Sequence, residues 1–442
     1  MHINKSENYH NNLFGFLVGF YPLAYILGNS IINILTTLIT VLGFSLYRKK
    51  IFFCNNKIYT LFLLSFFIYL ACTSIINNYP KLEELPNFFV NIKKSLFYFR
   101  YFLFFLVINY LCNKKLINFK FLYYFSAFLV LFLSLDILIQ LTFGKDLFGN
   151  EPIPRHYTGF FGDELVAGSY LQKFSFFLLF LIFVFKPQIK KNKKIILLVL
   201  FLVLSFSAVI LAGNRMPAFI YLMSAVTISL LIKKFRKGLL ILILIFSSVF
   251  FTLFNFNEGT KNDFKVFYNH SKEIITVLPK IFTNSGNLGV INSNHLQTFH
   301  AAIITWENKI IGGGIRSLRT NCPEDFNRTK NPYNDRRCNW HPHNFHLEIL
   351  IDMGLIGLFL FIPIFYFPII LFLKRFLFES NSISNLYVIV PFFIILSSEI
   401  FPIRTTGSFF TTSNATLIYL TLAIVLNFKT FEKKIDSNNN TY

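Results

Sequence analysis

Three closely spaced histidines mark the part of the sequence best suited to chemistry. His341, His343 and His346 stand where the longest polar segment, about residues 257–342, meets an apolar stretch of membrane length. Imidazole is the side chain best able to accept and release a proton near neutral pH. We therefore expect acid–base chemistry beside this segment, on a substrate held in the lipid.

A metal site is the alternative interpretation of these histidines. Cys338 lies three residues before His341 and could join it and His343 around a metal ion. This set lacks a fourth ligand at a usual spacing. We therefore expect neither a bound metal nor a cofactor.

Polar and charged residues within apolar stretches form a second group of candidates, because ionised side chains are costly in a membrane and usually functional there. Asp136 with Gln140, and Glu348 with Asp352, are spaced four apart, so each pair shares a helix face. We expect these pairs to orient arginines rather than to catalyse. The other members of the group are Arg100, Lys173, Arg215, Glu399 and Arg404.

The composition indicates which elements position these residues. Hydrophobic residues make up 54% of the 442, and charged residues only 14%. Apolar runs of about 17–25 residues recur along the chain, which is the length that crosses a bilayer. The sequence therefore predicts an all-α polytopic membrane protein. The first run has no evident cleavage site after it, and we expect it to be retained as a helix.

We count about twelve transmembrane helices, with one large loop carrying short helices between the ninth and the tenth. The tenth is longer than a bilayer requires, so we expect it to be tilted, or interrupted at Pro363 or Pro368. The spans lie near residues 12–28, 30–47, 57–76, 95–112, 119–143, 166–185, 195–212, 216–232, 238–256, 344–373, 384–402 and 408–427.

The basic residues indicate the orientation in the membrane. Lysine and arginine gather in the loops that share a side with the N-terminus, which is the positive-inside pattern. Both termini are then cytoplasmic. The net charge of +21 is mostly this topology signal, and its scatter over short inner loops argues against a nucleic-acid partner. The predicted parts are helices 1–9 (1–256), a large periplasmic loop (257–343), helices 10–12 (344–428) and a cytoplasmic tail (429–442).

Cys322 and Cys338 both fall in the periplasmic loop. An oxidising compartment favours a disulfide between them, which would close a loop of about 17 residues and contribute roughly 3 kcal/mol. Such a bridge would hold the charged segment Pro323–Arg337 beside the histidines. Two free thiols are the alternative.

The polar residues within the predicted spans lie almost entirely near the outer ends of the helices. This asymmetry distinguishes an enzyme from a transporter. A transporter usually places its polar groups near the midplane, between repeated halves, and the sequence shows no evident internal repeat. An outer belt that contains arginines suits an enzyme whose substrate has a lipid tail and a phosphate or diphosphate head.

Arg215 is the strongest single candidate for phosphate binding. It follows Gly213-Asn214, a turn that glycine makes easy. Pro217 marks the start of a new helix, whose N-terminus adds positive potential and free N–H groups. The alternative is that the Arg215 side chain extends to the membrane surface without binding phosphate.

The outer loop contains further candidates. Residues 265–282 and 295–311 show partial helical periodicity, and we expect them to lie on the membrane surface as lids. Gly312–Gly314 allow a sharp bend. Arg316 and Arg319 share a helix face if their segment is helical, and could then contact phosphate or an acidic sugar. The alternative is that Arg316 and Arg319 are only solvent-exposed charges that bind no ligand.

Several motifs together resemble the O-antigen ligase/O-antigen polymerase family of bacterial surface polysaccharide synthesis. The resemblance covers the helix count, the position of the long loop and motif detail over about residues 200–375. The motifs are Gly213-Asn214-Arg215, Trp306 with Gly312–Gly314, and His343-Asn344 followed nine residues later by Gly354-Leu355-Ile356-Gly357.

The resemblance implies a metal-independent, inverting glycosyltransferase whose donor is a glycan on undecaprenyl diphosphate. By position, His343 would be the general base that deprotonates the acceptor hydroxyl, and Arg215 would neutralise the diphosphate. Leu358 stands where ligases tend to have threonine, which favours a polymerase. His295 and His300 occupy the stretch in which a second arginine is expected.

The same chemistry is consistent on physical grounds. A diphosphate leaving group needs fixed cations, and no D-x-D motif is present to hold a metal. A general base accelerates attack by a hydroxyl about 10²–10⁴-fold. His341 and His346 are expected to cap or pack rather than to react.

We therefore expect a periplasm-facing enzyme of the bacterial inner membrane. Its partners would be the lipid-linked donor, a glycan or lipid-core acceptor and membrane lipid. The alternative is a twelve-helix polysaccharide or lipid exporter without catalysis. The expected substrate-binding residues are Arg100, Arg316, Arg319, Arg404, Asn344, Glu348, Asp136 and Gln140.

Overall fold

The structure is a computed structural model. It describes residues 5–52, 56–78, 85–154, 156–186, 188–236, 238–283, 291, 293–328, 338, 341–378, 383–405 and 407–432. Within these ranges most of the backbone is helical, and the β-structure consists of one isolated bridge between Ile153 and His156. The all-α fold expected from the sequence is confirmed.

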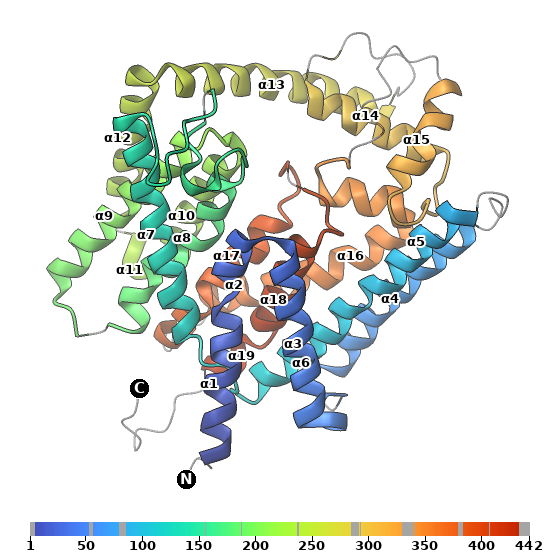
Figure 1. Ribbon diagram of the computed structural model, residues 1–442, viewed down its shortest axis with the longest axis horizontal. Coiled ribbons are helices and arrows are strands. Elements are labelled where there is room, and N and C mark those ends of the chain that lie inside the picture. Colours follow the sequence, from blue (N-terminus) through green and yellow to red (C-terminus); the bar gives the residue numbers. More distant parts are fainter. Residues whose placement is uncertain are drawn as a thin grey trace.

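Apolar helices form the body of the molecule, and each stretch expected to span the membrane is largely helical (Figure 1). These helices are α1 (Lys5–Gly19), α2 (Tyr21–Leu27), α3 (Asn29–Tyr47), α4 (Lys57–Asn78), α5 (Leu85–Tyr98), α6 (Arg100–Asn113), α7 (Lys120–Phe143), α8 (Ala167–Val184), α9 (Lys191–Leu211), α10 (Arg215–Leu231), α12 (Leu239–Phe256), α16 (Phe345–Phe378), α17 (Val390–Glu399) and α18 (Thr412–Leu426).

Seven helices of the described part of the chain are long and apolar enough to cross a bilayer, or eight if the bent pair α12–α13 counts as one span. Helices α10, α17 and α18 are apolar but shorter. The chain is therefore a multi-pass membrane protein, and the count of twelve spans stays a prediction.

Three polar helices follow α12 at one end of the bundle, which we call the α13 end. Helix α13 (Glu258–Thr283) is bent by 110° from α12 and crosses that end toward α14 (Asn294–Glu307) and α15 (Ser317–Arg328) (Figure 1). Both segments expected to form short helices in the loop are largely helical. Their position on a membrane surface stays a prediction.

Aromatic rings fill the core between α4, α6, α16 and α18. The ring centroids of Phe67 and Tyr419 are 5.4 Å apart, and those of Phe365 and Phe409 are 5.7 Å apart. Offset and edge-to-face ring pairs of this kind add to the stabilisation from burial. These ring contacts also anchor Phe409, and Phe409 holds the loop before α18 against the core.

Helix α16 is interrupted at Gly354 and not at Pro363 or Pro368, so that alternative was wrong, and the tilt stays a prediction. Gly354 has a φ of 65°, which is non-helical. Both prolines lie within helical backbone. Proline removes the N–H that would bind the carbonyl four residues earlier. For Pro368 that carbonyl belongs to Ile364, and it accepts a hydrogen bond from the Tyr59 hydroxyl at 2.6 Å instead.

The interruption of α16 receives the loop between α14 and α15. The backbone N–H of Gly313 donates to the carbonyl of Ile351 at 2.8 Å, and the N–H of Gly314 donates to that of Asp352 at 2.9 Å. A Cβ atom at Gly354 would overlap with the carbonyl oxygen of Ile310. The glycine-rich loop and the broken helix therefore fit each other and fix where α15 begins.

Candidate functional site

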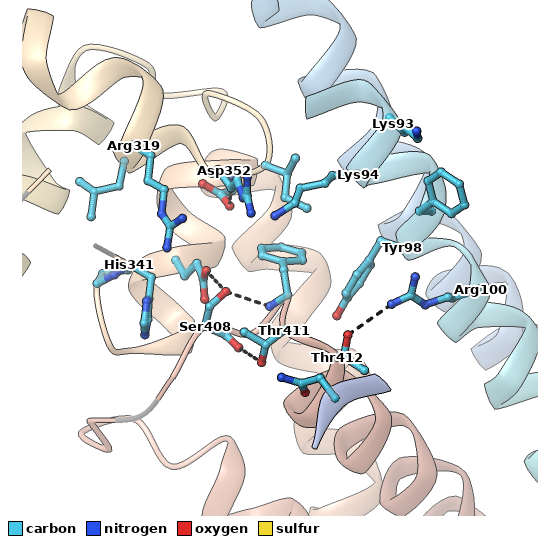
Figure 2. Close-up of a pocket in the computed structure, with 18 residues that line it drawn as sticks. Lys93, Lys94, Tyr98, Arg100, Arg319, His341, Asp352, Ser408, Thr411 and Thr412 are labelled. Carbon is cyan, nitrogen blue, oxygen red and sulfur yellow. Dashed lines mark hydrogen bonds between the residues drawn. The ribbon is translucent and has the colours of Figure 1, made fainter. Parts of the chain in front are cut away.

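A cavity of about 610 Å³ lies at the α13 end, between α5 on one side and α15 with the first turns of α16 on the other (Figure 2). The loop before α18 forms its floor. Five cationic side chains are part of its lining. They are Lys93, Lys94, Arg100, Arg316 and Arg319.

Helix α5 and the start of α6 supply one cationic wall. Figure 2 shows Lys93, Lys94 and Arg100 along this wall. The Arg100 guanidinium donates to the hydroxyls of Tyr101 at 2.8 Å and Thr412 at 3.5 Å. It also lies over the Tyr101 ring, 4.7 Å from the centroid. These contacts orient the Arg100 guanidinium toward the part of the cavity that adjoins α18.

Asp352 of α16 sets the position of the opposite cationic wall. Its carboxylate accepts hydrogen bonds from the backbone N–H groups of Arg316 at 3.0 Å and Ser317 at 2.9 Å. A carboxylate at a helix N-terminus satisfies free N–H groups and complements the helix dipole. Partial burial lowers the pKa of Arg316, and the neighbouring Arg319 guanidinium adds to this effect. A guanidinium nevertheless stays charged at neutral pH.

Glu348 of α16 fixes the floor in a similar way. Its carboxylate accepts hydrogen bonds from the Ser408 hydroxyl at 2.5 Å and from the backbone N–H of Phe409 at 2.6 Å. Glu348 and Asp352 are both buried and both bind backbone N–H groups. The two acids therefore hold the α15 wall and the floor in place through these hydrogen bonds.

The histidine segment borders the cavity beside Arg319. His341 and Pro342 are part of the lining, and Figure 2 shows His341 on the same side as Arg319, with Lys94 on the opposite wall. The His343 ring lies directly next to the His341 ring, with their centroids 4.2 Å apart. On its other side His343 contacts His295 of α14, at 5.4 Å.

Asn344 and His346 have structural contacts. The Asn344 side-chain oxygen accepts a hydrogen bond from the backbone N–H of Leu347 at 3.1 Å, which caps α16. Its amide group donates to the carbonyl of Pro402 at 2.6 Å. A His346 ring nitrogen is 2.9 Å from the Tyr366 hydroxyl. Asn344 thus ties the histidine segment to the loop after α17.

Cys338 is joined to Cys322 in a disulfide, which separates it from the histidines as a metal ligand. The bridge is buried with Ala301, Leu318 and Ile351, so it lies between α14, α15 and α16. Within the described ranges, no three His, Cys, Asp or Glu side chains converge as a metal would require. Most of the segment Pro323–Arg337 lies outside the described residues.

The structure places Arg215 and Arg404 away from the cavity lining. The Arg215 guanidinium forms an ion pair with Asp263 of α13 at 3.3 Å. Arg404 is buried and pairs with Glu399 at 2.9 Å, and Lys173 reaches the same carboxylate at 3.3 Å. These pairs fasten α13 to α10 and the loop after α17 to α8.

Asp136 and Gln140 hold the loop between α7 and α8. Asp136 accepts a hydrogen bond from the backbone N–H of Leu147 at 2.9 Å. Gln140 accepts one from Gly159 at 3.0 Å and donates one to the carbonyl of Asn150 at 3.2 Å. Asp136 and Gln140 were expected to orient an arginine, whereas these hydrogen bonds join them to the α7–α8 loop.

Lys93 and Lys94 were not among the residues expected at the site. The fourth span was predicted to begin near residue 95, whereas α5 already begins at Leu85. Lys93, Phe97 and Arg100 have the spacing of one helix face. That pattern was the available signal, and it depends on extending the helix outward past the apolar run.

A family model described as O-Antigen ligase matches residues 200–362. The matched segment contains Arg215, helices α13–α15, the histidine segment and the break in α16. No curated protein matches the chain. The match confirms the resemblance drawn from the motifs, and it identifies this segment with the O-antigen ligase family.

Proposed function

We propose that the protein is a glycosyltransferase of the O-antigen ligase type and that it works at the five-cation cavity. It moves a glycan from undecaprenyl diphosphate to a sugar hydroxyl, on the periplasmic side of a bacterial inner membrane. The observation that carries this proposal is the convergence of Lys93, Lys94, Arg100, Arg316 and Arg319 with His341 around one cavity.

The charge of the cavity suits a diphosphate. Its two acids, Glu348 and Asp352, already accept hydrogen bonds from backbone N–H groups and fix the walls. Arginine donors match phosphate oxygens in pairs. Fixed cations also stabilise the charge that develops on a leaving diphosphate, without rearranging during the reaction. The chain's own side chains would therefore supply the positive charge that many glycosyltransferases take from a metal.

The surroundings of the cavity suit a substrate that arrives from the membrane. Phe97 lines the cavity and is 57% exposed, and its neighbour Leu96 is 56% exposed. Exposed apolar side chains next to Lys93 and Arg100 allow a lipid tail to stay in the bilayer while its phosphates reach the cations. A cavity at one end of the bundle supports an enzyme over an exporter, which needs a polar path near the midplane.

The histidine segment would supply the base, and His343 is the residue assigned by the family motif. The acceptor hydroxyl loses its proton as its oxygen attacks the anomeric carbon of the donor. Attack opposite the diphosphate gives inversion. Arg319 and His341 lie on one side of the cavity, and the His343 ring adjoins His341, so a cation for the leaving group and the proposed base lie close to each other.

A transfer assay with the full-length protein in lipid vesicles tests the proposal. The donor is a lipid-linked glycan, and product is measured on gels. We expect Arg319→Ala to lower the rate about 10²–10³-fold, as loss of a fixed donor does in other enzymes. Lys145→Ala is the matched control, because Lys145 is exposed and lies outside the cavity. Full activity of an Arg319→Ala, Lys94→Ala double variant would contradict the proposal.

A gene deletion distinguishes the two acceptors. Loss of all glycan chains on the lipid core indicates a ligase, whereas retention of single-unit chains indicates a polymerase. Leu358, which replaces the threonine typical of ligases, favours the second outcome.

A further inference from the structure

We propose that the cavity binds two anionic groups at once: the donor diphosphate beside Arg316 and Arg319, and a second anion, carried by the acceptor, at Arg100. The second anion is a carboxylate of an acidic sugar or a phosphate ester, because a guanidinium binds both groups with the same paired donors. This inference rests on the proposed transferase function and specifies the chemical class of its acceptor.

Neutral groups alone hold the Arg100 side chain. Within the part of the chain that the structure describes, its hydrogen-bond partners are the hydroxyls of Tyr101 and Thr412, and both bonds come from Nη2. The Tyr101 ring lies against the guanidinium. Nε is buried and has no hydrogen-bond partner. These contacts fix the orientation of the side chain, but they leave its positive charge without a counterion.

Two arginines outside the cavity lining show what Arg100 lacks. Arg215 forms an ion pair with Asp263, and the buried Arg404 forms one with Glu399. A charged side chain at the end of an apolar bundle is costly unless its charge is compensated, and ionisable residues in such places usually have a function. Arg100 lines the cavity, so a ligand in the cavity can supply the missing negative charge.

The donor diphosphate has its own cations on the other side of the cavity. Arg316 and Arg319 lie on the α15 wall, and Lys94 faces them from α5, near enough for their positive charges to repel one another. An anion between these three side chains would relieve this repulsion. Figure 2 shows Arg100 on the far side of the cavity from Arg319, beyond Tyr98. Arg100 therefore belongs to a separate binding region.

The positive charge of the cavity exceeds what the donor diphosphate offsets. The lining contains five cationic side chains and two carboxylates, those of Glu348 and Asp352. A diphosphate diester carries about two negative charges, one on each phosphate. Binding of the donor alone would thus leave a surplus of positive charge, which a second anion at Arg100 would reduce.

Neutral polar side chains join the two cationic regions. Figure 2 shows Ser408, Thr411 and Thr412 along the floor between the side of Arg319 and that of Arg100. Hydroxyl groups both donate and accept hydrogen bonds, which suits the hydroxyls of a sugar. The acceptor must bring its attacking hydroxyl to the histidine segment, which borders the cavity beside Arg319. An acceptor that extends from there along the floor places its acidic group at Arg100.

Kinetics of the full-length protein in vesicles of phosphatidylcholine, whose headgroup has no net charge, test this assignment. The lipid-linked donor is saturating, and the acceptor glycan of the producing cells is supplied in three forms: intact, with its carboxyl groups reduced to alcohols, and with its phosphate esters removed. We expect Arg100→Gln to raise the KM for the intact acceptor about 10–100-fold, the effect of losing a hydrogen bond to a charged group. The value of kcat and the KM for the donor should stay nearly unchanged.

The neutralised acceptors identify the anion. The wild-type protein should show the same rise in KM with one of them, and that form tells whether a carboxylate or a phosphate is bound. The Arg100→Gln protein should no longer distinguish this form from the intact acceptor. Arg100→Lys keeps the charge but loses the paired donors, so its KM should lie between the two. If Arg100→Gln does not fold, the wild-type and Arg100→Lys proteins still provide the comparison.

Lys145→Gln is the matched control, because Lys145 is an exposed cation outside the cavity lining. All rates are normalised to folded protein measured by size-exclusion chromatography. Equal KM values of the wild-type protein for the three acceptors, or an Arg100→Gln protein that distinguishes them as the wild type does, would overturn the inference. So would a rise in the KM for the donor alone, which would assign Arg100 to the diphosphate. Each of these outcomes leaves the transferase function intact, whereas full activity of the Arg319→Ala, Lys94→Ala double variant would refute that function itself.

Discussion

The Asp352 carboxylate accepts a hydrogen bond from the backbone N–H of Arg316, and the Arg316 side chain lines the cavity. The carboxylate lies 3.0 Å from the Arg316 nitrogen and 2.9 Å from that of Ser317, at the start of α15. Two residues further along α16, the break at Gly354 admits the loop that leads into α15. The position of the cationic wall therefore depends on α16.

Removing the Asp352 carboxylate should displace this wall. We expect Asp352→Ala to reduce transfer activity about 100-fold, because a shift of about 1 Å at a positioned group has that effect. Asp352→Asn retains one acceptor oxygen and should lose less. Asp136→Asn is the control, since Asp136 holds the α7–α8 loop. Equal activities of the three variants, measured per folded protein, would show that Asp352 does not position the site.

A methyl group at Gly354 should disrupt the fold. Gly354 has a φ of 65° and a ψ of −165°, a region essentially restricted to glycine, so alanine there costs on the order of 1–3 kcal/mol. At Gly354 it would also overlap with the Ile310 carbonyl oxygen. Gly144 is in the left-handed conformation with open space around its Cβ position, so Gly144→Ala carries only the cost of that conformation, about 1–2 kcal/mol. We expect a much larger fall in thermal stability for Gly354→Ala than for Gly144→Ala in detergent. Equal falls would mean that the loop does not dock into the break.

The helices could be predicted from the sequence because each long apolar run must satisfy its backbone hydrogen bonds internally in lipid. The break in α16 could not. Pro368 looks disruptive, but Tyr59, which lies far away in the sequence, supplies the missing donor to Ile364. Gly354 looks tolerable in a helix, but the docking of residues 310–314 against it requires a non-helical conformation.

The site could be predicted in part. Arg100, Arg316 and Arg319 were expected to contact substrate, and the structure brings them to one cavity. Their convergence depends on packing between helices more than 200 residues apart, which spacing along the chain does not encode. Arg404 looked equivalent in the sequence. Its role is decided by the buried Glu399 beside it, which the sequence cannot place.

Replacement of Arg404 should therefore lower the level of folded protein, whereas replacement of Arg319 should lower activity. Arg404→Ala leaves the fully buried Glu399 with Lys173 as its remaining ion-pair partner. Breaking a buried ion pair costs on the order of 3 kcal/mol, so we expect a lower level of folded protein. Arg319 is exposed to the cavity, and Arg319→Ala should keep its protein level while losing activity. Quantitative immunoblots and transfer assays on both variants check this, and a stable but inactive Arg404→Ala protein would assign Arg404 to the substrate.

Formation of the Cys322–Cys338 disulfide tests on which side of the membrane α15 lies. The chain has five cysteines, so pairing of Cys322 with Cys338 leaves three free thiols. A maleimide-linked polymer should add three labels to the denatured protein, and five after reduction. We expect Cys322→Ser to reduce the stability by about 3 kcal/mol, the loop entropy of such a bridge. Cys72→Ser is the control, because Cys72 is a free, exposed thiol. Five labels without reduction would mean that α15 lies in a reducing compartment, and a periplasmic site would then be untenable.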